Sequence, residues 1–213
     1  GAARGTAITG ITGGLVSSTA VSLSFARQSQ VDKDPLAGDT LAAGILLAWM
    51  VMFARVVIMV AIVYAPLVAN VLVPFVAMGV ATAVLAGVFY WLGASRKRPV
   101  APSEEVKVKN PFSLTAATNF GLLFAVVLVI VKITERYAPA EGMYLVAAVA
   151  GLTDVDAITL SMTEYARQGN GLGLAAAAIA IAALSNTLVK CGMVLVLGSQ
   201  PLRLRLAVAT AAI

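Results

Sequence analysis

Two acidic residues stand in an otherwise apolar stretch of the chain. Asp154 and Asp156 lie within the hydrophobic segment 142–163. Ionisable groups are costly inside an apolar span, and they mark functional sites by default. Carboxylate oxygens are ligands that hard metal ions prefer, and carboxylates also carry protons. We therefore expect Asp154 and Asp156 to bind a cation, either a metal ion or a coupling proton.

The geometry of a helix limits how these two acids act together. Residues two apart on a regular helix point to opposite sides, so Asp154 and Asp156 would face different surroundings. Both face one cavity only if the helix unwinds locally, which Gly151 and Thr153 permit. Either arrangement suits cation ligation or proton relay.

Two basic residues lie in the middle of other apolar segments. Arg55 and Lys190 are too deep for their charged ends to reach the membrane surface comfortably. We interpret them as counter-ions of Asp154 or Asp156; an anion site or a coupling switch is the functional alternative. Arginine keeps its charge when buried, whereas lysine can lose its proton.

Two runs of neutral polar residues accompany the charges. They could supply oxygens along an ion or proton pathway, or they could hold helices together by hydrogen bonds. The runs are Ser17, Ser18 and Thr19, and Ser185, Asn186 and Thr187.

Glycines at 10, 13 and 14 precede the first run of hydroxyl residues. Small residues allow helices to approach closely, which is one interpretation of this stretch. A broken helix whose free amide groups line an ion path is the other.

The composition identifies the class of protein. The chain of 213 residues is 60% hydrophobic and 12% charged, with a mean hydropathy of +0.94. A soluble domain carries roughly twice that charge. Continuous apolar runs indicate membrane helices and not the alternating strands of a barrel. The sequence therefore predicts an all-α integral membrane protein.

The composition also narrows the chemistry. The chain has no histidine, which excludes imidazole metal ligands and histidine acid–base catalysis. A single cysteine excludes an internal disulfide. We expect no enzymatic activity, no catalytic residues and no cofactor. The net charge of +5 has no basic cluster interleaved with aromatic residues, so we expect no nucleic-acid partner.

Hydrophobic runs predict six to seven transmembrane helices in a single membrane domain, 1–213. The predicted spans are 5–26, 39–64, 67–93, 114–134, 142–163 and 171–198, and a seventh begins at 201–213. Their alternation puts most lysines and arginines in the loops on one side, which we assign to the cytoplasm.

An internal repeat accompanies these spans. Segment 14–25 aligns with 151–162 at five identical positions of twelve, and Ser17 then matches Asp154. Arg55 and Lys190 are as far apart in the chain as Pro66 and Pro201. We expect repeat one over 5–93 and repeat two over 142–213, linked by polar loop 94–113 and helix 114–134. Copies four spans apart are parallel, but they become inverted if one span is re-entrant.

Three strings carry a resemblance to a known family. They are GGLVSSTAV at 13–21, GLTDVDAITLS at 151–161 and ALSNTLVK at 183–190. Together they resemble the C-terminal membrane domain of unknown function attached to bacterial MgtC/SapB-like proteins. The resemblance implies a multi-pass protein of the bacterial inner (plasma) membrane, with an MgtC-like N-terminal domain absent here. The link to magnesium homeostasis belongs to that other domain, and the resemblance supplies no catalytic residues.

A transporter or channel-like protein for a cation is the leading functional hypothesis. The cation would be a divalent metal ion, or its transport would be coupled to protons, and Asp154 and Asp156 would be the tentative metal ligands. The alternative is a non-transporting scaffold or regulatory subunit, and a weaker one is an anion pathway at Arg55 and Lys190. Expected partners are an inorganic cation or proton, membrane lipid and a second copy in a homodimer.

Overall fold

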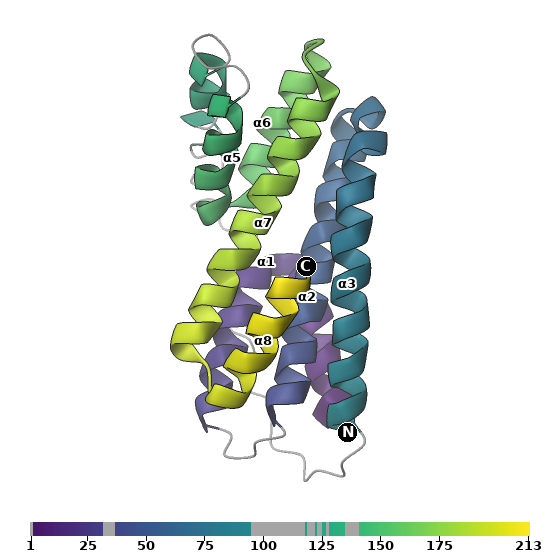
Figure 1. Cartoon of the computed structure of the whole chain (residues 1–213), viewed down its shortest axis with the longest axis vertical. Helices are drawn as coiled ribbons and strands as arrows, with labels where there is room; N and C mark the ends of the chain where they lie inside the picture. The colour runs from purple at the N-terminus through teal and green to yellow at the C-terminus, as the bar shows by residue number, and fades with distance from the viewer. Residues whose placement is uncertain are drawn as a thin grey trace. The chain divides into compact units, whose positions relative to one another are not determined.

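The computed structural model describes residues 2–31, 37–94, 118, 122, 125–126, 128–134 and 141–213 (Figure 1). These residues form helices joined by short connections and contain no strand, so the predicted all-helical class is confirmed for them. The elements are α1 (Ala2–Val31), α2 (Ala37–Val63), the short 3₁₀ helix η1 (Ala65–Leu67), α3 (Val68–Ala94), α5 (Glu141–Thr153), α6 (Val155–Arg167), α7 (Leu172–Leu197) and α8 (Gln200–Ala212).

Four of the described helices are long and apolar enough to cross a membrane. By length and composition they are Ala3–Val31, Gly38–Val63, Ala65–Ala94 and Leu172–Leu197. The length of Ala3–Val31 is counted across a break at Ser17. Large apolar side chains such as Val73, Val80 and Leu188 are exposed on these helices, as expected for surfaces that face lipid. The chain is a helical membrane protein. Span 114–134 lies mostly outside the described residues, although 128–134 is helical.

Two compact units make up the structure. Unit 1 contains residues 1–53, 77–109 and 188–213, and unit 2 contains residues 54–76 and 110–187. Helices α2, α3 and α7 each contribute one part to each unit.

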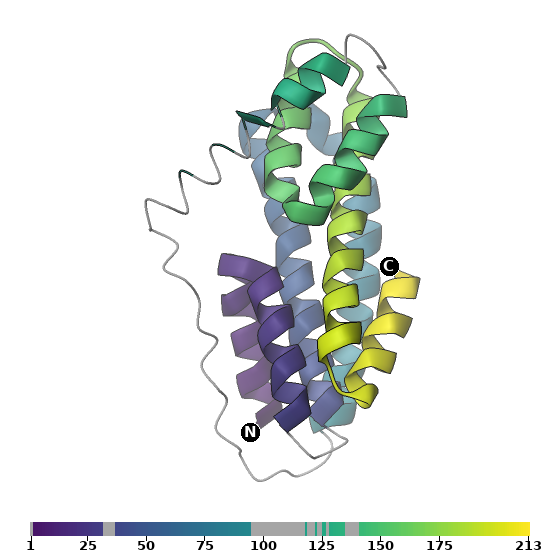
Figure 2. The same ribbon diagram turned by 90° about the vertical axis from the view of Figure 1, so that its left-hand side faces the viewer.

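The predicted span 5–26 is a helix with a break in its middle. Within α1, Ser17 has an extended backbone (φ −163°, ψ 106°), and its Oγ accepts a hydrogen bond from Ala20 N at 3.2 Å. Serine favours such a position because its hydroxyl oxygen caps the free amides at the start of the next helix. The chain turns back at this point, so that the two halves of α1 lie side by side (Figure 2). We call residues 2–31 hairpin 1.

The first half of hairpin 1 runs parallel to α2 in close contact. A Cβ atom on Gly10 would lie 2.4 Å from Gly44 O, and one on Gly14 would lie 2.7 Å from Ala48 Cα. The residue numbers of the contacting pairs, Gly10 with Gly44 and Gly14 with Ala48, increase in the same direction, so the two helices are parallel. Small residues allow this backbone approach, so the close-packing interpretation of the glycines is confirmed at Gly10 and Gly14.

The second half of hairpin 1 runs antiparallel to α2. Trp49 Nε1 donates a hydrogen bond to Ser22 Oγ at 3.0 Å, whereas Phe25 approaches Gly44. The C-terminal end of α1 is hydrogen-bonded to the residue that follows α7, since Gln30 Nε2 donates to Gly198 O at 2.9 Å. Helix α1 is therefore closely packed and also broken, and an ion path lined by its free amide groups stays a prediction.

The predicted span 142–163 is wrong as a single helix. Asp154 has an extended backbone (φ −154°, ψ 128°) between α5 and α6, each of which is 13 residues long. The two helices contact each other and run back along one another from Asp154 (Figure 2). We call residues 141–167 hairpin 2. A turn at Gly169, whose φ of 91° suits glycine, leads into α7.

Candidate functional site

Asp154 forms the tip of hairpin 2. Its Oδ1 accepts a hydrogen bond at 2.8 Å from the backbone nitrogen of Asp156, in the first turn of α6. Aspartate is among the best residues for this role, since its carboxylate satisfies a free amide at the positive end of the helix. One oxygen of Asp154 is therefore committed to backbone structure. The local unwinding that Gly151 and Thr153 were expected to permit is present at Asp154, directly after the end of α5 at Thr153.

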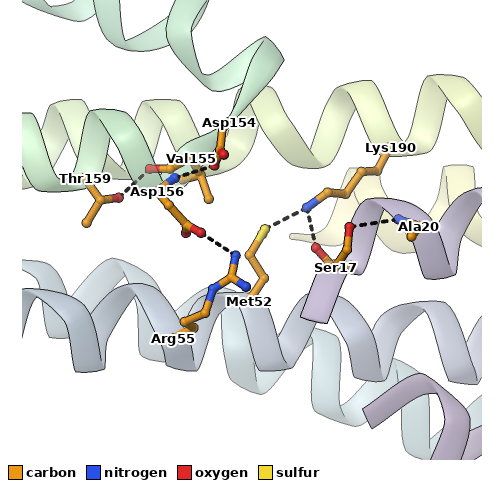
Figure 3. A network of polar contacts seen from close by, with 10 residues as sticks. Ser17, Ala20, Met52, Arg55, Asp154, Val155, Asp156, Thr159 and Lys190 are labelled. Carbon is orange, nitrogen blue, oxygen red and sulfur yellow. Dashed lines mark hydrogen bonds and ion pairs between the residues drawn. The ribbon is translucent and has the colours of Figure 1, made fainter. Parts of the chain in front are cut away.

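Asp156 pairs with Arg55 in unit 2. The Nη2 atom of Arg55, which α2 supplies, lies 2.7 Å from Asp156 Oδ2 (Figure 3). The Asp156 side chain is 17% exposed. This is one of the counter-ion pairs that the sequence predicts.

The second oxygen of Asp156 has a different environment. Oδ1 is buried and has no hydrogen-bond partner among the described residues. Buried polar atoms are nearly always hydrogen-bonded, and each exception calls for an explanation such as a water or an ion. One oxygen of Asp156 is therefore used in the ion pair with Arg55, and the other has no hydrogen-bond partner among the described residues.

Asn186 supports hairpin 2 from α7. Its Nδ2 donates a hydrogen bond at 2.9 Å to the carbonyl oxygen of Gly151. A broken helix leaves carbonyl groups without their usual partners, and a side-chain amide can satisfy one of them. Gly151 itself packs on the backbone of Ala182, from which a Cβ atom would be 2.4–2.9 Å away. The predicted interhelical hydrogen bond of Asn186 is present.

A complete metal cage is absent from the described residues. They contain no group of three or more histidine, cysteine, aspartate or glutamate residues that could hold a metal ion. Asp154 and Asp156 are two residues apart in the chain, but one oxygen of Asp154 caps α6 and one of Asp156 faces Arg55. A cation at this position would bind the second oxygen of Asp156 and complete its shell with backbone, hydroxyl or water oxygens.

The remaining described acid of α6 belongs to the surface. Glu164 accepts hydrogen bonds from Arg167 at 2.8 and 3.0 Å and from Gln168 at 2.9 Å. These bonds hold the pKa of Glu164 below its ordinary value. Glu164 is therefore not part of the candidate site and serves as an internal comparison for Asp156.

Lys190 forms the corresponding polar cluster in unit 1. The residue is 1% exposed, and its Nζ lies 2.8 Å from Ser18 Oγ. The same Nζ lies 2.7 Å from Met52 Sδ (Figure 3). Ser18 directly follows the break of hairpin 1 at Ser17. Each hairpin thus receives a basic side chain from a long helix within its own unit.

The other predicted pathway residues have simpler surroundings. Thr187 Oγ1 donates to Ala183 O at 2.8 Å in its own helix. Thr19 is exposed and Ser185 is half-buried. Thr159 Oγ1, one turn beyond Asp156 on α6, donates to Val155 O at 2.7 Å.

Two contacts could not be predicted from the sequence. The first is that of Lys190 with Met52, because a methionine in an apolar segment gives no sign that its thioether, a weak acceptor, contacts a charged group. The second contact is a bidentate ion pair between Arg205 on α8 and the buried Asp39 in the first turn of α2. Both residues flank apolar segments, where charged side chains are common and carry no pairing information.

Known proteins place the chain in a family. A relative described as an uncharacterized protein of Aquifex aeolicus (strain VF5) is 31% identical over 201 residues, which cover 92% of this chain and 84% of the relative. No solved structure matches the chain. The family model described as a domain of unknown function, DUF4010, matches residues 1–198. The chain therefore belongs to the DUF4010 family of domains.

Proposed function

We propose that this domain transports a cation across the membrane and that Asp156 is the carboxylate that binds it. The observation that carries the proposal is the state of the Asp156 carboxylate. One oxygen pairs with Arg55 at 2.7 Å, and the other is buried without a hydrogen-bond partner among the described residues. An intramembrane carboxylate with one oxygen in an ion pair and the other without a hydrogen-bond partner is suited to binding and releasing a proton or a metal ion.

The broken helices support this proposal. In membrane transporters, binding sites are formed by discontinuous helices, whose unwound backbone is tolerated only where it is buried in protein or lines a cavity. Hairpins 1 and 2 each contain such a break, at Ser17 and Asp154. We propose that each hairpin enters and leaves the membrane on the same side.

The internal repeat proposed from the sequence is the second support. The breaks fall at residues that the sequence alignment matches, and in both cases the side-chain oxygen caps the helix that follows. Gly14 packs on the backbone of α2, and Gly151 packs on the backbone of α7 in the same way. Repeats of this kind are typical of transporters.

The re-entrant hairpins make the proposed repeat inverted. If neither hairpin crosses the membrane, the spans between the start of α2 and the start of α7 are α2, α3 and the span 114–134 predicted from the sequence. An odd number of crossings reverses the direction of the second copy. The parallel arrangement expected from four intervening spans is thereby replaced in the proposal by an inverted one.

Other aspects of the functional hypothesis remain proposals of the same kind. They are a location in the bacterial inner membrane, attachment to an MgtC/SapB-like domain and a homodimeric assembly. A scaffold without transport and an anion pathway are outcomes of the test below and not parts of the proposal.

The test is ion flux into proteoliposomes that contain the purified domain. Ions are supplied one at a time as Na⁺, K⁺, Li⁺ and Mg²⁺ salts, and pH gradients are applied separately. We expect flux of one cation, or of protons, in the wild type and a loss of at least tenfold in Asp156→Asn. Glu164→Gln is the matched control, since it makes the same acid-to-amide change in α6 away from the candidate site.

Loss of the ion pair could itself destabilise the fold, so a second variant separates the two effects. Asp156→Asn combined with Arg55→Gln removes both charges and leaves no unpaired ion. This double variant should fold and should not transport. Cation flux at wild-type rate in either Asp156 variant would refute the proposal, and anion flux that depends on Arg55 would favour the anion pathway.

A further inference from the structure

The Arg55–Asp156 pair of unit 2 is bonded through one carboxylate oxygen, unlike a second arginine–aspartate pair of the protein. Arg205, in unit 1, donates to both oxygens of Asp39, from Nε to Oδ1 and from Nη2 to Oδ2. In the pair of unit 2 only Oδ2 of Asp156 is bonded (Figure 3), since Oδ1 has no hydrogen-bond partner among the described residues. Two parallel bonds strengthen an arginine–carboxylate pair and fix its geometry. The Arg55–Asp156 pair is therefore the more easily separated of the two.

Exposure distinguishes the same two pairs. The side chain of Arg55 is 33% exposed, against 23% for that of Arg205. The side chain of Asp156 is likewise more exposed than that of Asp39, at 17% against 8%. A partly exposed side chain can change its rotamer without moving its neighbours. Arg205 and Asp39 thus have the geometry of a permanent structural pair, whereas Arg55 has room to swing away from Asp156.

A metal ion at Asp156 would compete with Arg55 for the carboxylate. Metal ions bind several oxygen atoms at once, whereas a proton needs only one. Oδ1 of Asp156 has no hydrogen-bond partner with Arg55 in place, but Oδ2 becomes accessible to a metal ion only when the guanidinium withdraws. Two positive charges on one carboxylate also repel each other, strongly so in a low-dielectric interior. Binding of a metal ion and the contact with Arg55 therefore weaken each other.

The charge of Arg55 limits which metal ion can take its place. An arginine carries one positive charge and does not lose its proton, so the Arg55–Asp156 pair is neutral. A monovalent ion in place of the guanidinium leaves the carboxylate balanced as before. A divalent ion would leave one charge in excess, and Asp154 already uses one oxygen to cap α6. Because excess charge inside a membrane is costly, the exchange favours a monovalent ion.

We infer that Arg55 is an internal substitute for a transported monovalent metal ion, which displaces it from Asp156 on binding. This step rests on the proposed function and names its substrate class. In the empty state Arg55 neutralises Asp156, so the site can change its access from one side of the membrane to the other without an unpaired buried carboxylate. In the loaded state the ion takes over this role and the guanidinium withdraws. Arg55 thereby allows the empty site to return, which net transport requires.

Chemical modification of the wild-type protein measures the displacement directly. Phenylglyoxal, a dicarbonyl reagent, modifies guanidinium groups, and peptide mass spectrometry gives the modified fraction of each arginine. Choline chloride is replaced by LiCl, NaCl or KCl at constant ionic strength, and MgCl₂ is run in parallel. We expect one monovalent ion to raise the modification rate of Arg55 several-fold and to leave that of Arg205 unchanged. A rate at Arg55 that stays constant or falls as a monovalent ion saturates the protein would overturn the displacement, and so would a rise that only MgCl₂ produces.

The affinity of variants for the ion tests the competition by titration calorimetry. Arg55→Gln removes the resident charge, so the monovalent ion should bind about tenfold more tightly or better, the size of effect that an adjacent arginine has on a carboxylate's affinity for a proton. Arg55→Lys keeps the charge, so its affinity should lie closer to that of the wild type. Arg167→Gln is the matched control, because Arg167 is an exposed arginine of α6 that pairs with Glu164.

Unchanged or weaker binding in Arg55→Gln, relative to the Arg167→Gln control, would overturn the competition. The modification experiment needs no variant, so it decides the inference even if Arg55→Gln does not fold.

Flux into proteoliposomes tests the role of Arg55 in the empty state. Arg55→Gln lacks the counter-ion of the empty site, so net uptake into ion-free vesicles should fall by about tenfold or more. Exchange of a radiolabelled ion for the same unlabelled ion needs only the loaded site, so it should continue. Equal loss of net uptake and exchange in Arg55→Gln would overturn this role.

Failure of this inference differs from failure of the proposed function. Absence of binding and flux of every cation, protons included, would reject both. Metal-ion binding that Asp156→Asn abolishes, without a rise in the modification of Arg55, would reject the displacement and leave cation transport in place. Proton flux that depends on Asp156, without binding of a metal ion, would do the same.

Discussion

Replacing Gly151 by alanine tests whether hairpin 2 is held against α7 by direct backbone contact. An added Cβ atom would lie 2.4 Å from Ala182 O, 2.7 Å from Ala182 Cα and 2.9 Å from its carbonyl carbon. All three are backbone atoms of a 26-residue helix, so no side chain can rotate away to make room. Alanine at this position must therefore separate the two helices.

The cost follows from two opposing terms. Overpacking of this kind destabilises by about 1–3 kcal/mol, and a glycine-to-alanine change in a helix contributes about 1 kcal/mol in the other direction. Because the clash is with backbone, we expect the overpacking term to exceed the helix term. A domain of this size loses roughly 2–4 °C in Tm per kcal/mol, so Gly151→Ala should melt several degrees lower than the wild type.

Thermal unfolding in detergent, followed by circular dichroism, measures this effect. Gly192→Ala is the matched control on α7, since a Cβ atom at Gly192 meets nothing within 4 Å. The control should melt at the wild-type temperature or slightly above it. A Gly151→Ala protein as stable as Gly192→Ala would refute the close contact between hairpin 2 and α7.

Three further substitutions probe the same fold by unfolding measurements in detergent. Asp154→Ala should lose about 1 kcal/mol of stability with the helix cap, and Asp154→Ser should restore most of it; equal stability of the two variants would contradict the capping role. Asn186→Leu leaves the Gly151 carbonyl unsatisfied and should cost about 1–3 kcal/mol, whereas an unchanged Tm would show that this bond contributes nothing. Arg205→Gln leaves the buried Asp39 carboxylate unpaired and should cost about 3–5 kcal/mol; adding Asp39→Asn should recover much of the loss, and no recovery would argue against the pair.

The helical class and the long helices could be predicted from the sequence because they follow from local composition. Span 39–64 matches α2, and spans 67–93 and 171–198 match α3 and α7, within a few residues. Predominantly apolar runs of this length admit few alternatives in a membrane. The same reasoning predicts a single span over 142–163. It misses the boundary between α5 and α6, because one extended residue, Asp154, is enough to end the first helix and begin the second.

The helix breaks at Ser17 and Asp154 could be predicted only in part from the sequence. Serine and aspartate are frequent both as helix caps and as isolated polar residues inside membrane helices, so Ser17 and Asp154 alone do not define a turn. The direction in which the chain continues after each break depends on packing. Gly14 against Ala48 and Gly151 against Ala182 supply that packing, and their partners are far away in the sequence.

The charged residues of the candidate site can be picked out in the sequence, but the pairs that they form cannot. An acid in an apolar span requires a partner, and few bases lie at comparable depth, which limited the choice for Asp156 to Arg55 or Lys190. Which of these bases reaches Asp156 is decided by the three-dimensional fold. The Lys190–Met52 contact had no sequence signal, because methionine is the usual content of an apolar helix.

The most direct test of cation binding at Asp156 is thermal unfolding of the purified protein across a panel of ions and pH values. A ligand that binds the folded state stabilises it by mass action, by about 2.7 kcal/mol at a hundred times its Kd. We predict that one cation, at fixed pH, raises the Tm of the wild type and leaves that of Asp156→Asn unchanged. A wild type whose Tm responds to no ion, or an Asp156→Asn protein that responds equally, would contradict a cation site at Asp156.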